Sequence, residues 1–297
     1  MMTGYVRSKG LTLSGRQVSK SLQRVNPVNH ARRREDTVRR RNPVPYYASY
    51  HGNKLHCDQN EKLGMYGCTF YALSDGCSSR IVKLFSMPKK NAVIIYAHFR
   101  EILLHEGIWD MVRVDHGTEA CLMLFVQNLL RNERGNLGCE PYVQTQSRQN
   151  LPAERKWPEV NQRIIYPIKD VLVRMENGLL INLYDPVVQF CVSFITMNVA
   201  EVGLQRVVAS WNSHSIEGKS DRIPDVVAQR TSRVHPVNSA MVPSVEDAIQ
   251  MYTDAGGTIT RDSSFGDDPL ANSGVLNNQR ETEFIRDNPL SKKFTAM

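Results

Sequence analysis

The sequence predicts a mixed α/β fold, in which helices pack on the faces of a β-sheet. Over residues 53–177, short runs rich in β-branched and aromatic residues alternate with longer segments of helical periodicity. Ser74-Asp75-Gly76 lies between two of the early runs and is a hairpin turn signal. The chain has 297 residues, 41% apolar and 23% charged, so it has room for one sizeable core with appendages.

Five runs are expected as strands because they combine β-branched and aromatic residues with flanking turn residues. They are Lys54–Asp58, Tyr66–Leu73, Arg80–Phe85, Met111–Val114 and Pro141–Gln144. The predicted order is three meandering strands, then a helix, a strand, a helix, a strand and a helix. This order favours a mixed five-stranded sheet flanked by helices.

The helices are expected where apolar residues recur at every third or fourth position. The first two cover Asn91–His105, whose first residue suits an N-cap, and Thr118–Leu130. A third helix begins near Asn150, but Pro158 falls about two turns in, where a proline should kink or end it. A largely apolar helical region follows over residues 186–214.

The chain is expected to have three parts. Residues 1–50 form a basic N-terminal arm with one helix over Arg16–Arg24, which Ser14 can cap. This helix is either the remnant of a helix-turn-helix or a helix that packs on the main domain. Residues 51–216 form the core, and residues 217–297 form an extension whose polar composition predicts that it is largely disordered.

Several classes of protein are not expected from the composition. No apolar run reaches the roughly 18 residues of a membrane span, and the N-terminal basic residues lack the apolar stretch of a secretory signal. The six cysteines are scattered and form no CxxC pair, so neither a zinc knuckle nor a disulfide framework is indicated. Free thiols of this kind fit a reducing compartment.

Positive charge concentrates at the N-terminal end. Residues 1–56 carry twelve Lys and Arg against two Asp and Glu, a net charge of +10, whereas the whole chain carries +7. Two arginine triplets, Arg32-Arg33-Arg34 and Arg39-Arg40-Arg41, account for half of these basic residues. Such a concentration predicts contact with DNA or RNA. The alternative is a solvated linker or a nuclear-localisation signal.

Three acidic residues are candidates for metal-dependent chemistry. Asp58 and Asp115 each close a short apolar run, and Glu154 lies 39 positions after Asp115 on the third expected helix. Carboxylates delivered in this way can hold two Mg²⁺ or Mn²⁺ ions for phosphoryl transfer, because hard cations prefer oxygen ligands. An acidic residue at the end of a strand is also an ordinary turn residue. Three further acidic residues compete on similar grounds: Asp75, Glu119 and Glu159.

Four motifs follow one another along the chain around these residues. They are His56-Cys57-Asp58-Gln59-Asn60-Glu61-Lys62-Leu63, Asp75-Gly76-Cys77-Ser78-Ser79-Arg80, Arg113-Val114-Asp115-His116-Gly117-Thr118-Glu119 and Asn150-Leu151-Pro152-Ala153-Glu154-Arg155-Lys156-Trp157. The ordered set resembles the integrase core-domain proteins of animal genomes, which are relatives of retroviral integrases and DDE transposases. The resemblance covers residues 16–230, and later segments such as Trp211-Asn212-Ser213-His214 also look similar.

This resemblance implies a ribonuclease-H-like fold, DNA as the partner, and Asp58, Asp115 and Glu154 as ligands of two Mg²⁺ or Mn²⁺ ions. It places Asn150, Arg155 and Lys156 near the third carboxylate, where they are expected to contact DNA, as are the arginine triplets. We expect Trp157 to be a core anchor rather than a residue that stacks on bases. A nuclear protein is expected, with a homo-oligomer as the form that grips two DNA ends and with neither membrane nor small-molecule cofactor.

Three functional hypotheses remain open on the sequence. The first is a DDE-type integrase or transposase that transfers DNA strands by two-metal chemistry, and the intact acidic triad favours it. The second is a domesticated, catalytically inactive nucleic-acid-binding protein that keeps the integrase fold. The altered segment before Glu154 and the single N-terminal helix favour the second. The third is a ribonuclease-H-like nuclease without strand transfer.

Overall fold

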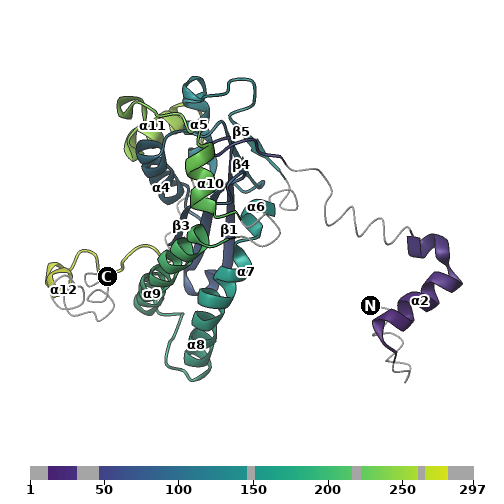
Figure 1. Ribbon diagram of the computed structural model, residues 1–297. Helices are drawn as coiled ribbons and strands as arrows, with labels where there is room; N and C mark the ends of the chain where they lie inside the picture. The colour runs from purple at the N-terminus through teal and green to yellow at the C-terminus, as the bar shows by residue number, and fades with distance from the viewer. Residues whose placement is uncertain (1–12, 32–46, 146–150, 216–221, 260–264, 280–297) are drawn as a thin grey trace. The chain divides into compact units, whose positions relative to one another are not determined.

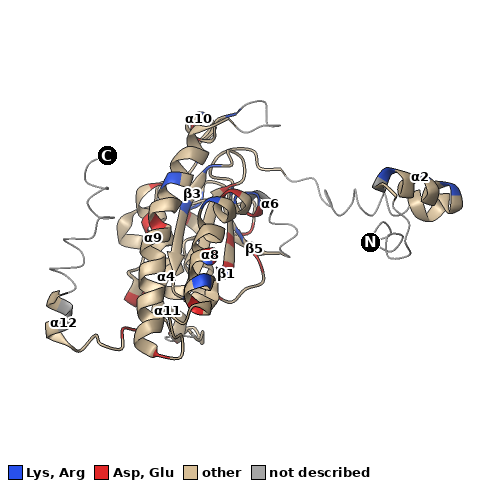
Figure 2. Ribbon diagram, turned by 90° about the horizontal axis from the view of Figure 1, so that it is seen from below, with Lys and Arg blue, Asp and Glu red and all other residues tan. Residues whose placement is uncertain are grey.

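The computed structural model describes residues 13–31, 47–145, 151–215, 222–259 and 265–279 (Figure 1). The chain separates into two compact units, residues 1–47 and residues 48–297. In the first unit, α2 (Gly15–Val25) begins after Ser14, whose side chain accepts a hydrogen bond from the backbone of Gln17 in a capping box. Lys and Arg recur along this helix (Figure 2), and the arginine triplets lie outside the described residues.

The second unit is built on the predicted five-stranded mixed sheet. Its strands are β1 (Lys54–Leu63), β2 (Cys68–Asp75), β3 (Ile81–Met87), β4 (Met111–Val114) and β5 (Tyr142–Gln144). They lie in the order β3-β2-β1-β4-β5. β1, β2 and β3 pair antiparallel, whereas β4 pairs parallel to β1 and β5 parallel to β4. This topology is ribonuclease-H-like, as expected.

The helices lie where the apolar periodicity predicts them. Asn91 caps α4 (Ala92–His105), and α5 (Cys121–Leu129) follows β4. The third predicted helix is divided into short pieces. They are α6 (Leu151–Glu154), α7 (Trp157–Val160), the π-helix η4 (Asn161–Ile165) and α8 (Tyr166–Asn177). Pro158 lies in the first turn of α7, where a missing backbone N–H costs no hydrogen bond, and Pro167 follows directly after the π-helix η4.

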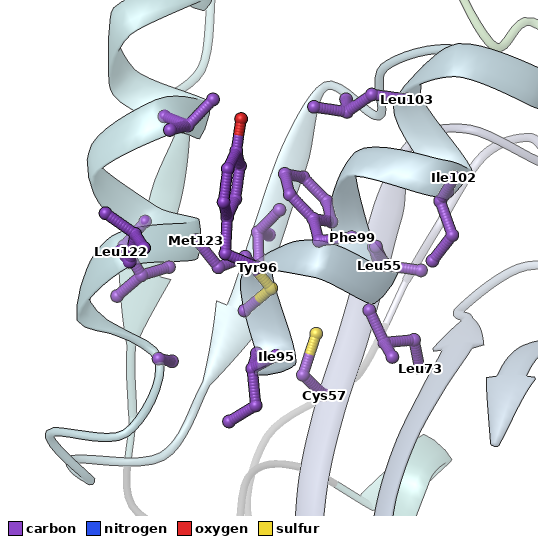
Figure 3. Close-up of a cluster of buried hydrophobic side chains, with 14 of the residues drawn as sticks. Leu55, Cys57, Leu73, Ile95, Tyr96, Phe99, Ile102, Leu103, Leu122 and Met123 are labelled. Carbon is purple, nitrogen blue, oxygen red and sulfur yellow. The ribbon is translucent and has the colours of Figure 1, made fainter. Parts of the chain in front are cut away.

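Apolar layers cover both faces of the sheet. One layer holds side chains of α4 and α5 against Leu55, Cys57 and Leu73 (Figure 3). The other holds side chains of α7, η4, α8 and α9 (Pro186–Ser213) against Phe70 and Ala72. Successive residues of a strand point to opposite faces, so β2 is buried along its whole length. The six cysteines, all in described ranges, are free thiols.

Asp75 of the hairpin motif has a structural role. It is fully buried, and its Oδ1 accepts hydrogen bonds from the backbone of Cys77 and from both the backbone and the hydroxyl of Ser78. Its Oδ2 accepts from the backbone of Gly52 and the indole of Trp109, both at 3.0 Å. This network joins the β2–β3 turn to the start of β1 and to the segment before β4.

The C-terminal extension is more ordered than its composition suggested. It contains α10 (Pro224–Thr231), α11 (Val245–Asp254) and α12 (Gly274–Gln279). Apolar residues of 234–259 pack on the α4 and α5 layer. Because these apolar residues are few and spaced apart, the segment as a whole still has a polar composition, and the composition did not indicate the packing. The division into arm, core and extension stays a prediction. Among the described residues of the second unit, short 3₁₀ turns also occur at η1 (Gly64–Tyr66), η2 (Arg131–Glu133) and η5 (Ser239–Met241).

Helix α9 differs from the expectation that the chain has no segment apolar enough to span a membrane. By length and composition alone, α9 is long and apolar enough to span a membrane. Scattered polar residues interrupt its apolar run, but they lower its mean hydropathy only slightly. One side of α9 packs in the second apolar layer, through residues such as Val192, Ala200 and Leu204. Near its end, the Asn212 side chain accepts a hydrogen bond from the Ile81 N–H and donates one to the Ile81 carbonyl.

Candidate acidic site

Asp58 and Asp115 lie just beyond the parallel ladder of β1 and β4. In the parallel ladder, Lys54 pairs with Met111, Leu55 with Val112 and His56 with Arg113. Asp58 and Asp115 each lie two residues after the last of these pairs, and the negative charge of Asp115 acts on Asp58. Cys57 points into the α4 layer (Figure 3), so Asp58 points to the opposite face, where α6 and α7 lie.

Two hydrogen bonds orient the carboxylate of Asp58. The indole N–H of Trp157 donates to Oδ2 at 2.8 Å, and the backbone N–H of Gln59 donates to Oδ1 at 2.9 Å. Burial raises the pKa of Asp58, these two hydrogen bonds lower it, and the negative charges of Asp115 and Glu119 raise it, with a rise as the net result. Trp157 is buried in the second apolar layer, and it also donates to the first candidate carboxylate.

Glu154 ends helix α6, which packs against β1 and β2. Its side chain is half-buried. Burial raises the pKa of Glu154, and the negative charge of Asp58 raises it further. Asp58 is therefore the residue that links the other two candidates, because its charge acts on Glu154 and the charge of Asp115 acts on it.

The donor set has the chemistry that a hard divalent cation requires. Burial and neighbouring negative charge raise the pKa values of Asp58 and Glu154, and a nearby positive charge stabilises such carboxylates in the ionised form. Within the described residues, however, no three His, Cys, Asp or Glu side chains gather closely enough to hold a metal ion. Carboxylates repel one another, and Asp58 and Asp115 are each engaged by a backbone N–H. Asp58, Asp115 and Glu154 have the oxygen ligands that such a cation prefers. Their side chains would have to move closer together to bind it.

Comparisons with known proteins identify the family of this chain. A family model described as the integrase core domain matches residues 46–238. The chain belongs to this integrase core family. Five solved chains match, among them the HTLV-2 integrase catalytic core domain in complex with magnesium, in a trimeric form. That structure has 11% identity and a TM-score of 0.39, and the match covers 61% of this chain and 99% of the viral one. No curated protein matches the chain.

The predicted DNA-contacting residues of this integrase core differ in how far they are exposed to solvent. Arg155 is exposed, and its contact with DNA stays a prediction, whereas Lys156 is 2% exposed. The ammonium of Lys156 lies over the ring of Trp211, 4.4 Å from its centroid. This differs from the expectation that Lys156 contacts DNA, because a buried lysine is not presented to phosphate. Asn150 lies outside the described residues.

The three competing acidic residues of the integrase core have different surroundings. Asp75 is structural, and Glu159 pairs with Arg163 at 2.7 Å on an exposed helix face. Glu119 is buried, and its charge acts on Asp58. Sequence reasoning missed the hydrogen bond from Trp157 to Asp58, because it joins the start of α7 to a strand 99 positions earlier in the chain.

The two histidines beside the aspartates also differ from each other. His56 is fully buried in β1, whereas His116 is exposed in the loop after β4. Of the two, only His116 is therefore presented to a bound substrate.

Proposed function

We propose that this chain is a DDE-type polynucleotidyl transferase that cuts and joins DNA ends with two divalent cations. The observation that carries the proposal is that Asp58 and Asp115 both lie two residues beyond the His56–Arg113 pair of the β1–β4 ladder, where the charge of Asp115 acts on Asp58 and that of Asp58 acts on Glu154. Asp58, Asp115 and Glu154 would hold the cations. When bound, Mg²⁺ or Mn²⁺ supplies an activated oxygen nucleophile and stabilises the leaving oxygen. A second copy of the chain is part of this proposal, because joining involves two DNA ends.

The residues of the chain prepare the carboxylates for this role. Trp157 and the Gln59 backbone each occupy one side of the Asp58 carboxylate and leave its remaining lone pairs available. Their hydrogen bonds fix the orientation of Asp58, and a fixed orientation lowers the entropy lost when a cation binds. Partial burial of Asp58 and Glu154 removes water from their oxygens, which strengthens their attraction to a cation.

Titration of Mn²⁺ into the purified protein tests the metal site. We expect wild type to bind two Mn²⁺ ions and Glu154→Gln to bind them at least about tenfold more weakly, because a direct ligand matters at least as much as an outer partner. Glu159→Gln is the matched control, since it removes the same charge five residues further on, in α7, but affects only the exposed pair with Arg163. Equal Mn²⁺ binding by wild type and Glu154→Gln would remove Glu154 from the site.

The basic arm is proposed to bind the DNA backbone. Replacing the six arginines of the two triplets with glutamine keeps the full chain and removes six positive charges. We expect weaker DNA binding and a flatter dependence of affinity on salt, by about 0.9 in logarithmic slope for each phosphate that the variant no longer neutralises. Fluorescence anisotropy at several salt concentrations measures both quantities. An unchanged slope would make the arm a localisation signal, in line with a nuclear protein, rather than a DNA-binding segment.

An inactive DNA-binding protein is the second candidate. The observation in its favour is that no three acidic side chains in the described residues are gathered in a metal-holding cluster. This candidate predicts DNA binding without Mn²⁺ binding in the titration above. It would leave the arm and the integrase fold as the functional parts of the chain.

A further inference from the structure

A pocket of about 700 Å³ lies between helix α9 and the segment formed by α7 and η4, which pack against each other (Figure 1). The buried side chains of Ile164 and Val207 line it. Two arginines, Arg163 and Arg206, also line the pocket, and both are exposed to solvent. The pocket therefore combines an apolar base with positive charge at its mouth.

Helix α9 contributes Arg206 and Ser210 to this pocket. The two residues are four positions apart, so their side chains lie on the same side of the helix. Neither side chain makes a hydrogen bond, ion pair or ring contact with any residue that the structure describes. A guanidinium has five N–H donors and no acceptor. Arg206 is therefore free to bind an acceptor of a ligand.

Arg163 approaches the pocket from η4. Its Nε donates to Glu159 Oε2 at 2.7 Å, and Glu159 is the one carboxylate in the lining. The two terminal nitrogens of Arg163 have no partner among the described residues, so the outer edge of its guanidinium is open. Two guanidinium groups that line one pocket repel each other, and an anion between them replaces this repulsion with attraction.

Close packing of α9 on η4 brings the two arginines to one pocket. A Cβ placed on Gly203 would lie 2.9 Å from Cγ1 of Ile164, closer than side-chain atoms normally approach. Gly203 thus lets α9 come nearer to η4 than a larger residue would allow. Arg206 follows Gly203 by three residues, which places it on the same side of α9.

The pocket adjoins the segment that carries the acidic site. Trp211 lines the pocket, and the ammonium of the buried Lys156 lies 4.4 Å from the centroid of its ring. Lys156 directly precedes Trp157, whose indole N–H donates to Asp58. A ligand in the pocket therefore contacts the same stretch of chain that orients the Asp58 carboxylate.

We propose that this pocket binds a phosphate group of the DNA backbone, with Arg206, Arg163 and Ser210 as the donors. The inference rests on DNA as the partner in the proposed function, and it adds a contact on the core to those of the basic arm. Arginine binds phosphate oxygens through two parallel N–H groups. Because the carboxylates of the acidic site repel phosphate, a basic pocket beside them supplies the attraction that holds the DNA strand there.

The variant Arg206→Gln tests the proposal, because it keeps a long polar side chain on an exposed helix surface and removes its charge. Fluorescence anisotropy with duplex DNA in EDTA measures affinity at several salt concentrations without a contribution from metal. We expect roughly fivefold weaker binding at low salt, the effect of one exposed charge pair. We also expect a logarithmic salt slope that is flatter by about 0.9, which corresponds to one phosphate.

The same substitution is also made in the chain whose two arginine triplets are glutamine, so that the arm does not mask a small change. The decrease in slope should be the same in both chains, because independent contacts add. Arg131→Gln, in η2, is the matched control. The side chain of Arg131 is also exposed and has no partner among the described residues, but it lies outside the pocket lining. This control should keep the wild-type slope.

The outcomes separate this inference from the proposed function. An unchanged slope in Arg206→Gln would show that Arg206 neutralises no phosphate, and an equal change in Arg131→Gln would show that the pocket has no special role. Either result overturns the inference without bearing on catalysis. If Arg206→Gln flattens the slope but wild type cuts no DNA in Mg²⁺, the phosphate site stands and the proposed function fails. If wild type binds no DNA, both fail.

Discussion

Replacing Asp58 with asparagine is expected to reduce Mg²⁺-dependent DNA nicking by at least about 10³-fold, which corresponds to about 4 kcal/mol of transition-state stabilisation. Asp58 is the carboxylate that links the others, since the charge of Asp115 acts on it and its own charge acts on Glu154. Asparagine keeps the shape and can still accept a hydrogen bond from Trp157, but it lacks the negative charge that a hard cation requires. Gel analysis of end-labelled duplex DNA measures the effect.

DNA binding should be nearly unchanged in this variant, because the proposed phosphate contacts lie in the basic arm and at Arg155. The matched control is Asp254→Asn, at the exposed end of α11, which should nick DNA like wild type. Comparable nicking by wild type and Asp58→Asn would show that Asp58 is not a metal ligand.

Replacing Asp75 with asparagine is expected to lower the free energy of unfolding at neutral pH by about 3–5 kcal/mol. Each oxygen of Asp75 accepts hydrogen bonds from at least two donors. The amide NH₂ of asparagine therefore faces donors in either orientation. Urea unfolding measured by circular dichroism gives the change, and Asp254→Asn should stay within about 0.5 kcal/mol of wild type.

The same residue gives the protein a defined acid sensitivity. Burial alone would raise the pKa of Asp75, but the hydrogen bond and charge of His51, with the backbone N–H groups of Ser78 and Gly52, lower it from 3.8 to about 2. A carboxyl with a lowered folded pKa stabilises the fold above its unfolded pKa, and the contribution is lost as the pH falls to the folded value. The stability gap between wild type and Asp75→Asn should shrink by about 2 kcal/mol between about pH 4 and pH 2. A constant gap over this range would contradict the assignment.

Local signals explain which elements were predictable. Met111–Val114 was predicted as a strand with its observed bounds, and Asn91 and Ser14 cap the helices assigned to them. Capping and apolar periodicity depend on neighbouring residues, so the sequence displays them directly. The strand Lys54–Asp58 was predicted too short, because polar residues of β1 beyond Asp58 hide its continuation to Leu63.

Long-range contacts explain what was not predictable. The register between β1 and β4 joins residues 57 positions apart, and the residue pattern alone does not fix it. The burial of Lys156 depends on Trp211, which lies on α9, far along the chain. The triad residues stay a prediction until metal binding or catalysis is measured.

The most direct measurement is cleavage and joining of end-labelled duplex DNA by the purified full-length protein, with Mg²⁺ and with EDTA. The proposed function predicts nicks and joined products in Mg²⁺ and neither of them in EDTA. DNA that is bound but stays intact in both Mg²⁺ and Mn²⁺ would contradict the proposed function and favour the inactive DNA-binding protein.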